Sequence, residues 1–425
     1  MSTPKLYVAI PAMDELQDLP LTMQDLAAQS AISNTEIFIC VNQPEEYWQT
    51  PEKKQICNHN MLLLQWLNDH ASPNLHVLDY ASPGNGWTGK KLGVGWARKV
   101  LFDHILSLAN PDDIIVSLDA DTRIRPHYLQ SIAENFQQHP QYPAISVPYY
   151  HPLTGQEAND RAILRYEIYM RNYAINLYKI NSPYSFTAIG SAIAMKAEAL
   201  RKIGGITPVK SGEDFYLLQK FRKMAPISNY NEEMVYPAAR FSDRVFFGTG
   251  PALIKGSQGS WESYPIYHHS LFKAIDETYH HLPELYTEDI ETPFLTFLQQ
   301  QMPNTKNPNE SIWQSIRNNV KDLPHFVQAF HEKADGLRIL QFLRQEHKEK
   351  TMAEESALYE NLKHWIGDAT PDWYHDKSTF SAMSIEQLQA IRDLLFQIEM
   401  DERLHSAQKH YITICLIRYY KSFSS

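Results

Sequence analysis

The sequence has few cysteines and no long apolar run, and both shortages restrict the classes of protein it can encode. Its 425 residues include three cysteines, at positions 40, 57 and 415, which are too scattered for a disulfide framework or a zinc motif. We therefore expect a reducing compartment. Apolar stretches such as residues 412–417 are far shorter than a membrane span, and the N-terminal one is too short for a signal peptide. These features predict a cytoplasmic protein, with a peripheral membrane contact left open.

The chain also lacks an excess of positive charge. Lys and Arg number 39 against 49 Asp and Glu, which gives a formal net charge of −10. Such a surface has no general attraction for nucleic acid or anionic lipid. We expect no nucleic-acid partner, and we expect any anionic ligand to be held by a local site. The hydrophobic fraction of 43% and the charged fraction of 21% are those of an ordinary globular protein.

Short apolar runs alternate with helical patterns in the first part of the chain. Apolar, β-rich runs predict strands, and apolar residues at helical spacing predict helices between them. Alternation of this kind indicates a doubly wound α/β domain. We expect strands at residues 6–10, 36–41, 75–78, 114–118 and 188–195, and helices at residues 16–29, 60–70, 96–108, 159–179 and 212–223.

The composition changes near Tyr267. From residue 268 onward the pattern is mostly helical, rich in Gln, Glu, His and Leu, with apolar residues spaced for packing. We predict an α/β domain over residues 1–267 and a helical region of unknown role over residues 268–425, a reasonable place for homo-oligomer contacts. The helix predicted at 159–179 is rich in Tyr and Arg, so it either borders a binding site or packs in a core.

Two carboxylates follow the apolar run at residues 114–118, as Asp119-Ala-Asp121. Ligands of open α/β folds bind where parallel strands end, and two carboxylates there repel each other unless a cation joins them. Mg²⁺ and Mn²⁺ prefer oxygen ligands and bridge carboxylates to phosphate oxygens. The pair therefore predicts a metal site that holds a diphosphate, although the same residues also suit a turn.

Two further motifs carry chemistry. Glu213-Asp214 opens a predicted helix after Gly212, where an acidic residue serves either as a cap or as a general base, the role we consider for Asp214. The loop from Pro83 to Lys90 is rich in glycine, so its backbone and lysine suit a phosphate. Its spacing differs from that of a P-loop, and an ordinary flexible loop remains the alternative.

Taken in order, these motifs resemble the glycosyltransferase family 2 enzymes of the GT-A fold over residues 6–259. The opening Val8-Ala-Ile-Pro11-Ala-Met-Asp14-Glu15 is similar to the start that lines the nucleotide pocket of that family, with Asp14 in place of its usual Asn. The run ending at Asn42 is similar to its second strand, which ends in an Asp or Asn beside the nucleotide base. The remaining parallels are Gly89-Lys90-Lys91 near the donor, the Asp-x-Asp motif at Asp119 and Asp121, and the Glu-Asp motif at Glu213 and Asp214.

The resemblance implies a GT-A mixed sheet flanked by helices and a metal-dependent sugar transfer that inverts the anomeric centre. It implies Mn²⁺ or Mg²⁺ as cofactor, a UDP- or GDP-sugar as donor, and a glycan, a lipid-linked molecule or a small molecule as acceptor. By the same resemblance Asp214, beside Glu213, is the catalytic base. The implied metal ligands are Asp119, Asp121 and His268, and the implied donor-binding residues are Pro11, Asp14, Glu15, Asn42, Lys90, Asp119 and Arg244.

The sequence departs from the family in one region. The Gln-x-x-Arg-Trp motif and the membrane helices of the processive synthases are missing, and a segment with Arg240 and Arg244 takes the place of that motif. Either arginine is a candidate for contact with the diphosphate. Two other functions stay open: a sugar-phosphate nucleotidyltransferase, although its glycine- and arginine-rich loop does not follow Pro11, and a non-catalytic scaffold with a GT-A-like domain.

Overall fold

The structure is a computed structural model that describes residues 3–90, 92–209, 212–240, 249–303, 310–349, 352–371, 374 and 379–422. It divides into two compact units, each described here by itself. Unit 1 comprises residues 1–166, 186–261 and 403–425, and unit 2 comprises residues 167–185 and 262–402. Two helices, α5 (Glu157–Lys179) and α16 (Ile385–Ser422), contribute residues to both units.

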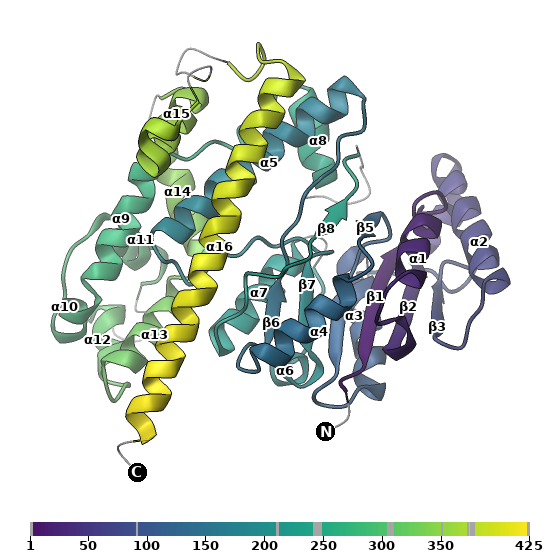
Figure 1. The fold of residues 1–425 in the computed structure, drawn as a ribbon, viewed down its shortest axis with the longest axis horizontal. Helices are drawn as coiled ribbons and strands as arrows, with labels where there is room; N and C mark the ends of the chain where they lie inside the picture. The colour runs from purple at the N-terminus through teal and green to yellow at the C-terminus, as the bar shows by residue number, and fades with distance from the viewer. Residues whose placement is uncertain are drawn as a thin grey trace. The chain divides into compact units, whose positions relative to one another are not determined.

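A six-stranded mixed sheet forms the centre of unit 1 (Figure 1). Its order is β3-β2-β1-β4-β7-β6, in which β3, β2, β1 and β4 run parallel and β7 is antiparallel to both of its neighbours. A separate pair, β5 and β8, is antiparallel. The strands are β1 (Leu6–Ala12), β2 (Thr35–Asn42), β3 (Leu75–Tyr80), β4 (Ile114–Ser117), β5 (Thr122–Ile124), β6 (Ala144–Ser146), β7 (Ile193–Lys196) and β8 (Val235–Pro237).

Apolar sequence places β1 and β4 at the middle of this sheet. Every residue of β1 is buried, and so is every residue of β4. Leu6 of β1 pairs with Thr35 on one side and with Ile114 on the other. Strands covered on both faces lose the apolar–polar alternation of surface strands, which is why these runs are continuously hydrophobic.

Helices flank the sheet of unit 1. The α3 helix packs against β1 and β2, α2 packs against β2, and α6 packs against β7. Gln29 and Ser30, just after the end of α1, each donate a hydrogen bond to a backbone carbonyl in the segment before α4. The helices of unit 1, besides its parts of α5 and α16, are α1 (Leu19–Ala27), α2 (Lys54–Asp69), α3 (Val94–Leu108), α4 (Tyr128–Gln138), α6 (Ala197–Lys202), α7 (Glu213–Met224) and α8 (Thr249–Ser257).

Among the described residues of unit 2, the regular secondary structure is helical. Aromatic side chains fill its interior, among them Trp313, Phe326 and Phe330, all buried. Side-chain oxygens of Thr292, Ser311, Asp322 and Asp335 cap successive helices, which is the usual way to satisfy the first backbone amides. Besides its parts of α5 and α16, the unit contains α9 (His269–His280), α10 (Leu282–Thr287), α11 (Pro293–Gln301), α12 (Ile312–Arg317), α13 (Leu323–Lys333), α14 (Gly336–Lys348) and α15 (Glu354–Ile366).

A buried ionic network links α5 to α16 within unit 2. Arg171 Nη1 lies 2.7 Å from Glu399 Oε2, and its Nη2 lies 3.3 Å from Glu167 Oε2. Arg392 Nη1 lies 3.0 Å from the same Glu167 oxygen. All four side chains are almost fully buried. From the sequence, this Tyr- and Arg-rich helix either borders a binding site or packs in a core. At Arg171 the structure supports packing in a core.

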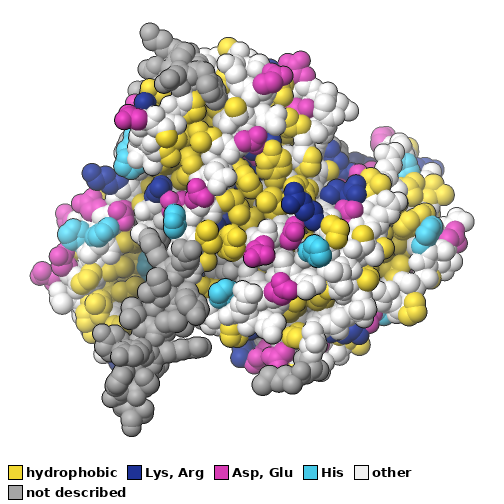
Figure 2. All heavy atoms as spheres, in the orientation of Figure 1, with side chains coloured by type: hydrophobic (Ala, Val, Ile, Leu, Met, Phe, Trp, Pro, Cys, Tyr) yellow, Lys and Arg dark blue, Asp and Glu magenta, His cyan; other side chains and the backbone are white. Residues whose placement is uncertain are grey.

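The mixed sheet, its flanking helices and the helical C-terminal region confirm the predicted fold class. Compactness divides the chain between residues 261 and 262, and it also assigns residues 167–185 to the helical unit. The predicted boundary at Tyr267 between two consecutive domains stays a prediction. Among the described helices, none has the length and apolar character needed to cross a bilayer. Acidic and basic side chains are interspersed over the face seen in Figure 2.

Candidate active site

The parallel strands of unit 1 end at one edge of the sheet, and several predicted residues follow them there. Pro11 lies on β1, Asn42 ends β2, and Asp119 is the second residue after β4. Carboxyl ends of parallel strands form the ligand-binding edge of open α/β sheets. Asp14 and Glu15 follow β1, so this edge gathers the polar residues expected from the motifs.

Arg98 joins the two acidic motifs. This arginine lies on α3, and its guanidinium contacts Asp119 Oδ1 through Nη2 and Glu213 Oε1 through Nη1. The side chains of Arg98 and Glu213 are 5% and 3% exposed, whereas that of Asp119 is 33% exposed. A buried charge needs a close partner of opposite sign. The structure thus brings the Asp-x-Asp and Glu-Asp motifs together around one buried cation.

Asp214 lies at the start of α7, next to Glu213, and keeps partial exposure. Burial of its carboxyl group, reinforced by the negative charge of Glu213, raises its pKa to about 7, against the opposing effect of Arg98. Burial also raises the pKa of Asp119, while Arg98 acts in the other direction. A carboxylate with a pKa near neutrality is suited to accept and release protons at physiological pH.

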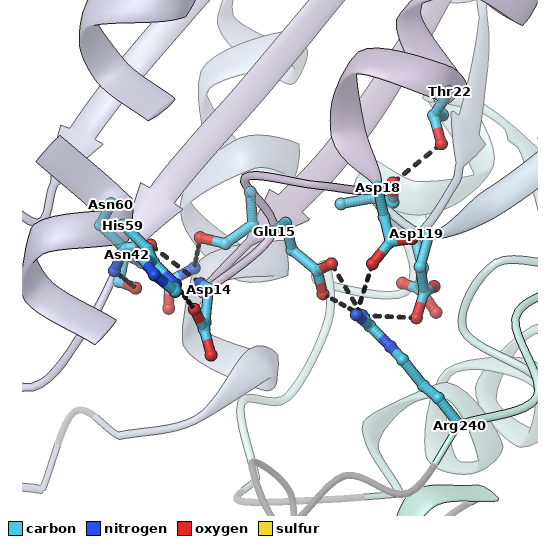
Figure 3. A network of polar contacts seen from close by, with 12 residues as sticks. Asp14, Glu15, Asp18, Thr22, Asn42, His59, Asn60, Asp119 and Arg240 are labelled. Carbon is cyan, nitrogen blue, oxygen red and sulfur yellow. Dashed lines mark hydrogen bonds and ion pairs between the residues drawn. The ribbon is translucent and has the colours of Figure 1, made fainter. Parts of the chain in front are cut away.

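Arg240 is a second cation among the acidic side chains of this edge (Figure 3). Its Nη2 lies 2.6 Å from Glu15 Oε1 and 2.7 Å from Asp121 Oδ2. Its Nη1 lies 2.6 Å from Asp18 Oδ2. Three carboxylates from two segments thus contact one guanidinium. Like charges this close together repel each other unless a cation lies between them, and the guanidinium is that cation.

Gly190 leaves room for the Arg98 guanidinium. A Cβ atom at this position would collide with Arg98 Nη2 and Cζ. We expect Gly190→Ala to force Arg98 away from Asp119 and Glu213, to cost about 1–3 kcal/mol of stability by overpacking, and to lower turnover. Urea unfolding and steady-state kinetics measure the two effects. Unchanged values for both would show that the Arg98 contacts are not held as described.

The polar residues around Asp14 form a network of hydrogen bonds within the protein. Asp14 has a positive φ of 61°, which is uncommon for a residue with a side chain. It is held there by Asn60, which accepts from the Asp14 amide at 2.8 Å, and by His59, whose Nδ1 lies 2.6 Å from Asp14 Oδ1. Strained backbone of this kind clusters at functional sites.

Asn42, predicted to lie beside a nucleotide base, is buried and bonded within the protein. Its Nδ2 donates to the Ala12 carbonyl at 3.0 Å, and its Oδ1 accepts from the indole of Trp87 at 3.1 Å. The Trp87 ring stacks on Tyr80 with centroids 4.2 Å apart. Asn42 therefore positions the Trp87–Tyr80 pair, so two stacked aromatic rings, that of Trp87 buried, lie close to the residue where the motif predicts a base.

The glycine-rich loop differs from the phosphate-binding arrangement considered from its sequence. The amides of Gly84 and Gly86 donate to the two carboxylate oxygens of Glu45, at 2.9 and 2.8 Å. These amides are thus occupied by an anion of the protein itself. Lys90 lies in an exposed turn that follows this loop, and the neighbouring Lys91 lies outside the described residues.

Two other predicted residues lie outside the described part of unit 1. Arg244 lies outside the described residues. His268 belongs to unit 2, where its ring nitrogens contact Ser270 Oγ at 2.8 Å and Glu360 Oε2 at 2.9 Å, and where it caps α9. The capping contact explains its place in the sequence, immediately before a helix.

The donor atoms at this edge suit a hard divalent cation, with one condition. Asp119 and Asp121 provide carboxylate oxygens, and Mg²⁺ commonly binds one or two such groups together with phosphates and water. No group of three or more His, Cys, Asp or Glu side chains is set to hold a metal among the residues that the structure describes. The pair therefore fits a cation once Arg240 releases Asp121.

Two residues of the site were not singled out from the sequence: Arg98 and Asp18. A signal for Arg98 exists. It lies on α3 in register with the buried Leu101, Phe102 and Ile105, so the helical period puts a charged residue on the apolar face. A charge in that place needs a buried partner. Asp18 carries no comparable pattern.

The comparison with protein families finds a match over the central part of the chain. Residues 114–250, about a third of the chain, match the family model described as glycosyl transferase family group 2. The match begins at β4 and includes both acidic motifs and Arg240. The match confirms the resemblance and the enzyme class predicted from the sequence: over these residues the chain is similar to glycosyltransferases of family 2 type.

Solved structures similar to the chain include TarS residues 1–349 of S. aureus in complex with UDP-GlcNAc, at 13% identity and a TM-score of 0.41, covering 96% of this chain and 92% of that one. A mannosyltransferase of Pyrobaculum calidifontis, PcManGT, in complex with GDP-Man and Mn²⁺ is similar at 13% identity and a TM-score of 0.35, covering 95% and 88%. The comparison with curated proteins gives no match.

Proposed function

We propose that this protein transfers a sugar from a nucleoside-diphosphate sugar to an acceptor hydroxyl, with inversion at the anomeric carbon and with Mn²⁺ or Mg²⁺ as cofactor. The observation that carries the proposal is the joining of the two acidic motifs by Arg98, which contacts both Asp119 and Glu213. In this proposal the Asp-x-Asp motif serves the diphosphate, and the Glu-Asp motif serves the acceptor. The family match over residues 114–250 supports this class of reaction.

In this proposal Asp214 is the catalytic base. Its pKa of about 7 leaves a large fraction of the carboxylate ionised at neutral pH and still basic enough to take the acceptor proton. The acceptor oxygen attacks the anomeric carbon from the face opposite the nucleotide, and the bond to the diphosphate breaks. Glu213, held by Arg98, fixes the start of α7 and so the position of Asp214.

Asp119 and Asp121 are the residues that would hold the cation, which when bound supplies positive charge to the departing diphosphate. His268, the third ligand implied by the resemblance, stays a proposal, as do the donor contacts of Lys90 and Arg244. For the nucleotide pocket we propose Pro11, Asp14 and Glu15, with the stacked rings of Tyr80 and Trp87 near Asn42 beside the base.

The identity of the partners follows from the same chemistry. We propose a UDP- or GDP-sugar as donor, and a glycan, a lipid-linked molecule or a small molecule as acceptor, in the cytoplasm. Self-association through the C-terminal helices remains a proposal of the sequence. A sugar-phosphate nucleotidyltransferase would use the same carboxylates, but it would release pyrophosphate instead of a nucleoside diphosphate.

The products distinguish these functions. The full-length protein is incubated with Mn²⁺, a panel of UDP- and GDP-sugars and simple glycan acceptors, and the released nucleotide is identified by chromatography. We expect a nucleoside diphosphate and a glycoside whose anomeric configuration, read by NMR, is opposite to that of the donor. Release of pyrophosphate would indicate the nucleotidyltransferase, and failure to bind any donor with Mn²⁺ would indicate the scaffold.

A further inference from the structure

Arg240 lies where a cation is needed. Its guanidinium contacts Glu15, Asp18 and Asp121 at 2.6 to 2.7 Å. These contacts use Oδ2 of Asp121, one of the two oxygens that this residue has to offer a metal. An arginine fork with carboxylate partners on both terminal nitrogens forms strong, charge-assisted hydrogen bonds.

A metal ion and this guanidinium have opposing demands on Asp121. A divalent cation at Asp121 would place two positive charges within a few ångströms of the guanidinium, and like charges at that distance repel each other. The same carboxylate oxygen also cannot face both partners with good geometry. Binding of one cation therefore weakens binding of the other.

Building on the proposed function, we propose that Arg240 is a tethered competitor of the metal: it neutralises Asp121 when the site has no donor, and it must withdraw before a divalent cation binds there. The chain thus carries its own occupant of the cation position. Metal alone binds weakly, because its affinity is reduced by the free energy of breaking the Arg240 contacts.

The surroundings of Arg240 favour an exchange of partners over a permanent structural role. Its side chain is 27% exposed, in contrast to the 5% of Arg98. Its Nε is buried and has no hydrogen-bond partner among the described residues, so one donor of the fork is unused there. A diphosphate would offer this arginine bidentate acceptors. Donor and metal would then bind cooperatively, since each removes an obstacle to the other.

Calorimetric titration of Mn²⁺ into the full-length protein tests the proposal without any measurement of turnover. We expect Arg240→Gln to bind Mn²⁺ alone at least about tenfold more tightly than the wild type, a difference of about 1.4 kcal/mol. Arg161→Gln is the matched control, because it removes the same charge from an arginine that pairs with Glu157 on α5. It should bind Mn²⁺ as the wild type does. The electron paramagnetic resonance signal of free Mn²⁺ gives an independent count of bound ions.

A second titration tests the exchange. UDP or GDP, whichever the wild type binds, should raise the Mn²⁺ affinity of the wild type by about tenfold or more, and should raise that of Arg240→Gln much less. Equal Mn²⁺ affinity in the wild type and in Arg240→Gln, or weaker binding in the variant, would overturn the competition while leaving the metal site in place. No Mn²⁺ binding to either protein, even with a nucleoside diphosphate, would instead overturn the metal-dependent function on which it rests.

Discussion

Replacing Asp214 with Asn should lower turnover by about 10²–10⁴-fold while leaving donor affinity nearly unchanged. General-base catalysis contributes a factor of this size, and an amide of the same shape cannot accept the proton. Asp214 has no described contact with Asp121 or Arg240, so the donor should still bind. Asp103→Asn is the control, because Asp103 is exposed and pairs with Lys99.

The pH dependence gives the same prediction a second test. Because burial raises the pKa of Asp214 to about 7, the base is mostly protonated, and therefore inactive, below this value. We expect kcat/KM of the wild type to rise about tenfold per pH unit below pH 7 and to level off above it. In Asp214→Asn this rise should disappear. Wild-type turnover in the variant, or an unchanged pH profile, would exclude Asp214 as the base.

Replacing Glu167 with Ala should cost about 3–5 kcal/mol of stability, because it removes a buried carboxylate that two buried guanidinium groups share. Glu167 contacts both Arg171 and Arg392, and all three side chains are buried. Urea unfolding followed by circular dichroism measures the loss. Glu157→Ala is the control on the same helix: its carboxylate is exposed, and such a change should stay within about 0.5 kcal/mol of the wild type.

A double replacement separates the unpaired charge from the lost volume. In Glu167→Met with Arg392→Met, one carboxylate and one guanidinium leave together, and apolar atoms fill their place. Buried ion pairs are often replaced in this way at little cost, so we expect the double variant to be more stable than Glu167→Ala. A single variant as stable as the wild type would mean that this network does not hold α5 against α16.

The main strands of unit 1 could be predicted from the sequence, since burial on both faces produces uninterrupted apolar runs. The runs at 6–10 and 36–41 fall within β1 and β2. The run at 114–118 contains β4 and one residue more. The short strands β5, β6 and β8 have three residues each. A run of that length carries no period, so their pairing depends on neighbours that are distant in the chain.

The site was predictable where its residues are adjacent in sequence, and not where its contacts are distant. Asp119 with Asp121, and Glu213 with Asp214, are visible as motifs. The partners of Arg240 lie 222 and 225 residues away, at Asp18 and Glu15. The same holds for the ion pair of Arg171 with Glu399, 228 residues apart. Only the folded chain shows which buried charge neutralises which.

The central claim, that Asp121 holds the diphosphate through a divalent cation, is tested most directly by calorimetric titration of the donor. A UDP- or GDP-sugar is titrated into the wild type with Mn²⁺, into the wild type with EDTA, and into Asp121→Asn with Mn²⁺. We predict that the last two titrations show about a hundredfold weaker binding than the first. Equal affinity in all three would contradict the proposed metal site and the mechanism built on it.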